Sequence, residues 1–296
     1  MCEICPRCCG ANRAIGAVGY CGADDTLRVA RSALHHWEEP PISGTRGSGT
    51  VFFSNCSLRC VFCQNAEIST GGLGQTITVE RLAELFLELQ QQGAHNINLV
   101  TPTHYQPQII VALDLARAAG LQLPIIYNTS GYETVETIQL LTGYVDIYLT
   151  DFKYASRELA ARYSKAPDYP QIAEAALQAM FEQVGEYSVD EGGMLRRGII
   201  VRHLMMPDQR TDSQAVLDKL CARYGNSICY SLMNQYTPMP DVSQFPELCD
   251  TVDEREYSEL IDYALNLGVT NSFMQEGDTV GESYIPPFDT LSNSAL

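Results

Sequence analysis

The spacing of three cysteines in the sequence CSLRCVFC constrains this chain more than any other feature. Cys56, Cys60 and Cys63 are separated by three and then by two residues, so their thiolates can converge on one face of a cluster. Three ligands leave one iron of a [4Fe-4S] cube without a protein ligand, and a small molecule can bind and react there. The motif therefore indicates a cofactor site rather than a structural crosslink.

The sequence shows neither a membrane-spanning segment nor a signal peptide, and this sets the cellular location that we expect. No apolar run approaches the roughly 20 residues that span a bilayer, and the first residues lack the apolar core of a signal peptide. We therefore expect a cytoplasmic protein, in which grouped cysteines among the total of 11 bind metal instead of forming disulfides. The net charge of −17 repels anionic lipids and phosphate backbones, which argues against membrane and nucleic-acid partners.

A second group of cysteines lies among glycines in residues 1–23, at Cys2, Cys5, Cys8, Cys9 and Cys21. Cys5 and Cys8, two residues apart and followed by Cys21, have spacing typical of metal ligands, but the second close pair of a zinc ribbon is missing. A bound metal, either zinc or a second iron–sulfur cluster, is one interpretation. A reduced, cysteine-rich cap packed on the main domain is the other, and both stay open.

Residues 24–49 combine a short amphipathic piece around 27–34 with a loop rich in proline and glycine. We expect Trp37, the only tryptophan, to anchor this loop by packing. His35 and His36 are weak metal-ligand candidates, because adjacent histidines point in different directions. We divide the chain into a cysteine-rich extension and loop at 1–49, a main domain at 50–280 and a polar, proline-containing tail at 281–296.

Strand and helix patterns alternate through the main domain. Buried strands are expected at 50–54, 97–101, 124–131, 144–154, 195–207 and 226–238, each followed by a helical pattern, with a final short strand in 270–275. The stretch 156–193 reads as an acidic, helical, enlarged crossover without a strand. Right-handed crossovers would lay six such units side by side as a parallel sheet or an open barrel.

Polar residues gather where these strands end, in TPTH, NTSG, TDFK, VRH and MNQY. Barrel and open α/β enzymes place their active sites at the carboxyl ends of their strands. This pattern favours an enzyme whose site includes the cysteine motif, which follows the first strand.

The three-cysteine motif, with Phe62 before its third cysteine, resembles the signature of the radical S-adenosylmethionine (SAM) superfamily. The segments CEICPRCCGANR, SGTVFFSNCSLRCVFCQN, NLVTPTH, YNTSGYE, YLTDFKY, VRHLMMP and SLMNQYTP resemble uncharacterised iron–sulfur proteins related to pyruvate formate-lyase activating enzyme. The resemblance implies an α/β fold of the partial (β/α)6 TIM-type barrel class. It also implies that Cys56, Cys60 and Cys63 hold a [4Fe-4S] cluster, with SAM on the fourth iron through its amino and carboxylate groups.

Further cofactor contacts are implied position by position. The family's Gly-Gly-Glu motif is replaced here by Thr101, Pro102, Thr103 and His104, whose polar side chains would take its role. The activase's Asp-Thr pair corresponds to Asn128 and Thr129, and its Asp-x-Lys to Asp151 and Lys153. Phe62, Arg202 and Tyr236 complete the expected set.

Each of these contacts has a structural alternative. His104 could cap a helix, Asp151 and Lys153 could form a strand-end salt bridge, and Arg202 could pair with a core carboxylate. Since Asn128 replaces an aspartate, the monovalent cation that the activase binds there stays open.

The function that the resemblance implies is reductive cleavage of SAM to methionine and a 5′-deoxyadenosyl radical, which abstracts hydrogen from a substrate. An external donor such as flavodoxin or ferredoxin would supply the electron, and the glycine backbone of a partner protein is one candidate substrate. A non-catalytic iron–sulfur electron-transfer protein and a zinc-stabilised binding scaffold are the alternatives. No individual catalytic residue is predicted.

Overall fold

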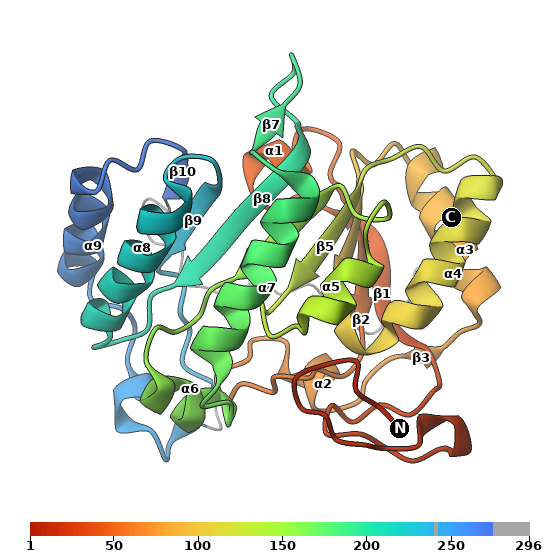
Figure 1. The fold of residues 1–296 in the computed structure, drawn as a ribbon, viewed down its shortest axis with the longest axis horizontal. Helices are drawn as coiled ribbons and strands as arrows, with labels where there is room; N and C mark the ends of the chain where they lie inside the picture. Colours follow the sequence, from red (N-terminus) through yellow and green to blue (C-terminus); the bar gives the residue numbers. More distant parts are fainter. Residues whose placement is uncertain (240–241, 275–296) are drawn as a thin grey trace.

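The computed structural model describes residues 1–239 and 242–274, and the tail expected at 281–296 lies outside them. One sheet organises the fold, with strands in the order β10-β9-β8-β6-β5-β4-β2-β1-β3 and β7 paired to β8 (Figure 1). Within these ranges no pairing joins β10 to β1 or β3, so the sheet curls without closing.

Among the described residues, seven strands of the sheet run parallel to one another. They are β2 (Ser48–Phe53), β4 (Ile97–Val100), β5 (Ile125–Thr129), β6 (Ile147–Asp151), β8 (Leu195–Leu204), β9 (Cys229–Met233) and β10 (Ser272–Met274). This arrangement confirms the expected partial barrel of strand-helix units.

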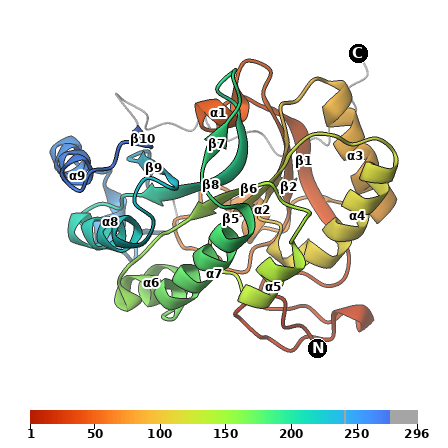
Figure 2. The ribbon, with the colours of Figure 1, turned by 45° about the horizontal axis from the view of Figure 1, so that its top comes forward.

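Helices cover the outer face of the sheet (Figure 2). The longer ones are α3 (Val79–Gln91), α4 (Gln106–Ala118), α5 (Val135–Leu140), α6 (Arg157–Ser164), α7 (Tyr169–Val184), α8 (Arg210–Tyr224) and α9 (Glu254–Asn266). Local signals fix their starts. The Thr78 hydroxyl, for example, accepts a hydrogen bond from the Arg81 amide at 3.1 Å and caps α3.

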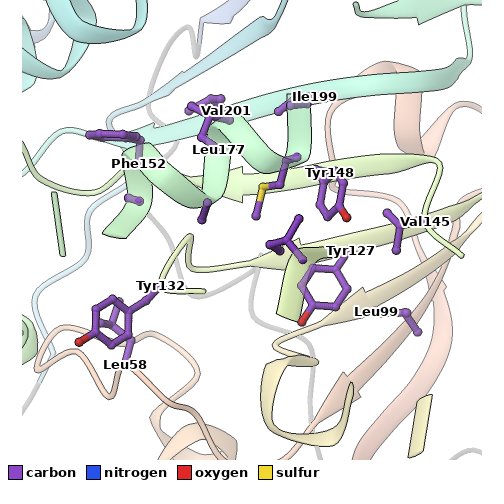
Figure 3. Close-up of a cluster of buried hydrophobic side chains, with 14 of the residues drawn as sticks. Leu58, Leu99, Tyr127, Tyr132, Val145, Tyr148, Phe152, Leu177, Ile199 and Val201 are labelled. Atoms are coloured by element: carbon purple, nitrogen blue, oxygen red, sulfur yellow. The ribbon is translucent and has the colours of Figure 1, made fainter. Parts of the chain in front are cut away.

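Two apolar layers follow from the alternation of side chains along each strand. The outer layer lies between sheet and helices, where Tyr127, Tyr148 and Ile199 pack with residues such as Leu177 of α7 (Figure 3). The inner layer fills the base of the barrel and comprises Ile42, Ile126, Ile147, Leu149, Leu195, Ile200 and Cys229. Ile42 belongs to the short helix α1 (Pro40–Ser43), so residues from before the first parallel strand occupy the barrel interior.

Residues 24–49 differ from expectation. The amphipathic piece is a strand, β1 (Arg28–His35), which pairs antiparallel with β2 and with the short β3 (Gln75–Thr76), so it belongs to the main sheet. The role expected for Trp37 is wrong, because 66% of this residue is exposed.

The enlarged crossover does contain one short strand, β7 (Ser188–Val189), contrary to the prediction for 156–193. The two residues are exposed, so no buried apolar run marked this strand in the sequence. In the part of the chain that the structure describes, no helix has both the length and the apolar character to cross a membrane.

Candidate cofactor site

A cavity of about 520 Å³ opens at the carboxyl ends of the parallel strands. Its wall includes Cys56, Cys60 and Cys63 from the loop after β2, together with side chains from the ends of β4, β5, β6, β8, β9 and β10. The volume lies within the range of about 300–1,000 Å³ that is typical of small-molecule sites. The strand-end residues and the cysteine motif therefore meet in one place, as their positions in the sequence predict.

The three sulfur atoms each accept a hydrogen bond. The Ser164 hydroxyl donates to Cys60 Sγ at 3.0 Å, the Ser69 hydroxyl donates to Cys63 Sγ at 3.3 Å, and the Leu58 amide donates to Cys56 Sγ at 3.4 Å. Burial raises the pKa of the Cys56 thiol to about 12, and the neighbouring Cys60 and Cys63 add to the rise. The three thiols lie near one another, and hydrogen-bond donors point at their sulfur atoms. This arrangement suits the binding of a positively charged group between the thiols.

The donor set fits a cluster better than a single ion. No group of three or more His, Cys, Asp or Glu side chains within 1–239 and 242–274 is placed to hold one metal ion. A [4Fe-4S] cube does not require three side chains to converge on one metal ion, because each thiolate binds a different iron. The chemistry of three cysteines on a cavity wall, with donors to each sulfur, therefore fits the cube.

The same observation gives no support to a second metal at the N-terminal cysteines. Cys5 and Cys21 are buried, Cys2 is half-buried, and Cys8 and Cys9 are exposed. The second metal stays a prediction.

Asp151 and Lys153 lie side by side on the cavity wall at the end of β6, with Nζ 2.6 Å from Oδ2. Burial alone would lower the pKa of Lys153, but the Asp151 carboxylate outweighs it and holds that pKa above its ordinary value. The lysine is therefore a fixed cation near Cys60, whose thiol pKa it lowers against the larger effect of burial. A charged pair of this kind can bind a zwitterionic ligand.

The loops after β4 and β5 supply the neutral polar part of the wall. Thr101, Asn128, Thr129 and Ser130 all line the cavity. Thr101 has a φ of 58°, in the left-handed region, and its amide donates to the Asn128 carbonyl at 2.9 Å. This strained turn aligns the ends of two neighbouring strands.

Arg202 lines the cavity but is already paired. Its Nε donates to Glu39 Oε1 at 2.7 Å, and its Nη2 donates to both Glu38 and Glu39. The amide of Asn98 donates to Glu38 at 2.8 Å. The two carboxylates come from the segment between β1 and α1, and sequence reasoning missed them, although an arginine on a buried strand requires such partners.

Three of the expected contact residues do not line the cavity. His104 Nε2 lies 2.7 Å from the Ser54 carbonyl oxygen, and burial lowers the pKa of this histidine to about 4. The Thr103 hydroxyl donates to Glu133 at 2.5 Å. The Tyr236 hydroxyl donates to the Leu248 carbonyl at 2.7 Å, and its ring packs on Phe62, which does line the cavity.

Glu133 is a buried carboxyl group that sequence reasoning did not single out. It accepts hydrogen bonds from the hydroxyls of Thr103 and Thr129, and its Oε2 has no hydrogen-bond partner among the described residues. Burial raises its pKa to about 7, although the two hydroxyls lower it in part. Glu133 thus ties the loop after β4 to the cavity-lining Thr129.

Comparisons with known proteins give several similarities. Residues 50–185 match the sequence model of the radical SAM superfamily. The uncharacterised protein MJ0674 of Methanocaldococcus jannaschii is 28% identical over 276 residues, which cover 90% of this chain and 73% of that protein.

Two solved structures are similar to this chain at low identity. Streptococcus suis SuiB, bound to precursor peptide SuiA, is 15% identical with a TM-score of 0.49, over 75% of this chain but only 46% of that one. Methylornithine synthase (PylB) is 13% identical with a TM-score of 0.46, over 74% of this chain and 68% of that one.

Proposed function

We propose that this chain is a radical SAM enzyme that cleaves SAM reductively and abstracts hydrogen from a substrate. The observation that carries the proposal is the single cavity into which the three-cysteine loop and the polar ends of β4, β5 and β6 all face. The stretch 50–185, which matches the radical SAM sequence model, includes the three-cysteine loop and all three of these strands.

The roles of the lining residues follow from their chemistry. Cys56, Cys60 and Cys63 would hold a [4Fe-4S] cluster, which with bound SAM supplies reductive cleavage to methionine and a 5′-deoxyadenosyl radical. Asp151 and Lys153 present fixed opposite charges for the amino and carboxylate groups of SAM. Thr101, Asn128 and Thr129 offer neutral donors and acceptors beside them.

Arg202 has a different role in this proposal. Its guanidinium pairs with Glu38 and Glu39, so it holds the segment before α1 against the end of β8 instead of binding SAM directly. His104 and Thr103 support the ends of β2 and β5 from behind. Tyr236 fixes the ring of Phe62.

The proposed substrate is a glycyl residue of a partner protein, as for the activase that the sequence resembles. The volume of the cavity supports a small reacting group, because SAM alone would take up much of 520 Å³. Among the described residues, none of 1–34 lines the cavity, so that part of the extension does not form its wall. An external flavodoxin- or ferredoxin-type donor would supply the electron.

Electron paramagnetic resonance of the reduced protein tests this function. Protein reconstituted anaerobically should contain about four irons per chain, and its reduced spectrum should change when SAM is added. A cluster whose spectrum ignores SAM would identify a non-catalytic electron-transfer protein. Zinc in place of iron would identify a binding scaffold.

A further inference from the structure

Arg7, in the cysteine-rich extension, contacts the central cysteine loop directly. Its guanidinium donates to four main-chain carbonyl oxygens, those of Ser57 at 2.9 Å, Leu58 at 3.1 Å, Ser164 at 2.8 Å and Lys165 at 2.5 Å. Two of these carbonyls lie between the first and second cysteines of the motif, and the other two end helix α6. One side chain therefore joins two segments that are over a hundred positions apart in the sequence.

These carbonyls belong to the groups that surround the thiols. The Ser57 and Leu58 carbonyls accept from Arg7, and the Leu58 amide donates to Cys56 Sγ at 3.4 Å. Ser164, whose carbonyl Arg7 also holds, donates its hydroxyl to Cys60 Sγ at 3.0 Å. The Val61 amide completes the junction by donating to the Tyr163 carbonyl at 2.9 Å.

Only an arginine can make this set of contacts. A guanidinium carries five N–H donors in a rigid plane, whereas a lysine ammonium has three on a flexible stem. The central carbon Cζ of the guanidinium lies 4.1 Å from the centre of the Tyr20 ring and 5.0 Å from that of Tyr132. Both rings hold the guanidinium by cation–π attraction, so the orientation of its donors is fixed before any cofactor binds.

We propose that Arg7 is a positioning residue of the cluster site, through which the cysteine-rich extension sets the conformation of the Cys56–Cys63 loop. The inference rests on the proposed function, since it assumes that this loop holds a [4Fe-4S] cluster. It adds that residues 1–23 form part of the cluster site and not a separate module. Loss of outer contacts to metal ligands typically weakens metal binding about 10- to 100-fold.

The test compares Arg7→Lys and Arg7→Gln with a matched control, Arg117→Gln. Arg117 also donates to two carbonyls, those of Gly143 and Tyr144, and lies 5.3 Å from the Tyr144 ring, but it is remote from the cysteines. Iron per chain, the paramagnetic resonance spectrum of the reduced cluster, and the rate of iron loss to a chelator are measured in the full chain. The melting temperature of each metal-free variant reports folding separately.

Arg7→Gln should release iron about 10-fold faster or more and should change the spectrum, with Arg7→Lys intermediate and Arg117→Gln like the parent. This result, at melting temperatures equal to that of the control, supports the inference. If both Arg7 variants retain parental iron, spectrum and release rate, the inference is wrong while the proposed function stands. If Arg7→Gln does not fold, the folded Arg7→Lys decides between these outcomes. Parent protein that binds no iron overturns the proposed function instead.

Discussion

The main-chain amide of Cys56 donates a hydrogen bond to the carbonyl oxygen of Cys21 at a distance of 3.4 Å. This bond joins the first cysteine of the central motif to the last cysteine of the N-terminal group. Nearby, an Arg13 Nη donates to the His104 carbonyl at 2.5 Å, and His104 in turn contacts Ser54. The N-terminal cysteine group and the central motif therefore belong to one structural unit. In this unit the N-terminal extension contacts the central loop from outside the cavity.

Removal of one cavity cysteine should abolish the cluster, whereas removal of a remote cysteine should not. Cys60 lines the cavity, but Cys221 lies on α8, on the outer face of the sheet. We expect Cys60→Ala to lose nearly all iron after anaerobic reconstitution, and Cys221→Ala to retain it. Iron analysis checks this, and equal iron content in the two variants would refute the ligand assignment.

The hydroxyl of Ser164 should tune the cluster potential. A donor to a thiolate stabilises the reduced, more negative cluster, so Ser164→Ala should lower the reduction potential. A net hydrogen bond of about 1 kcal/mol corresponds to a shift of about 40 mV for one electron. Redox titration measures it against Ser213→Ala, whose hydroxyl donates to the Gln209 carbonyl far from the cysteines. An unchanged or higher potential would contradict the prediction.

The carboxylate of Asp151 should contribute to SAM affinity. Asp151→Asn keeps the shape of the side chain but removes the charge, so a charge-assisted hydrogen bond worth about 1.5–3 kcal/mol is lost. We expect the dissociation constant for SAM to rise about 10-fold or more. Anaerobic calorimetry compares this variant with Asp218→Asn, which removes the charge of an exposed carboxylate that accepts a hydrogen bond from Tyr263 on the outer face. If Asp151→Asn and the parent protein bind SAM with equal affinity, Asp151 does not contact SAM.

The buried Glu133 should make stability depend on pH. Burial raises its pKa from 4.5 to about 7, so the folded state holds a proton that the unfolded state has released. The free energy of unfolding should therefore fall as pH rises from about 4.5 to about 7, by about 3 kcal/mol for this group.

The variant Glu133→Gln should lack that loss, because its amide oxygen still accepts from Thr103 and Thr129. Urea unfolding of both proteins at several pH values isolates the effect. We expect the variant to gain stability relative to the parent above pH 7 and not below pH 4.5. A constant difference across this range would contradict the prediction, because it would mean that folding does not raise the pKa of Glu133.

Sequence patterns predicted the parallel strands because each has a short buried run followed by a polar end. They could not distinguish the strand β1 from a helix, since it alternates irregularly, with a register shift between Val29 and Arg31. They also missed the partners of Arg202, because Glu38 and Glu39 lie in a segment rich in proline and glycine, where no periodicity marks burial.

The Thr-Pro-Thr-His segment illustrates a different limit. Its position at a strand end placed it correctly beside the site, but the direction of each side chain depends on the backbone. Thr101, at positive φ, faces the cavity, while His104, three residues later, points to Ser54. The linear spacing of cysteines also gave no indication that Arg7 would reach the loop at 57–58.

The formation of 5′-deoxyadenosine tests the central claim most directly. Anaerobically reconstituted protein, supplied with SAM and a strong reductant, should release 5′-deoxyadenosine and methionine, and Cys60→Ala treated in the same way should release neither. If protein with a full complement of iron forms no 5′-deoxyadenosine, the claim that this cavity cleaves SAM is wrong.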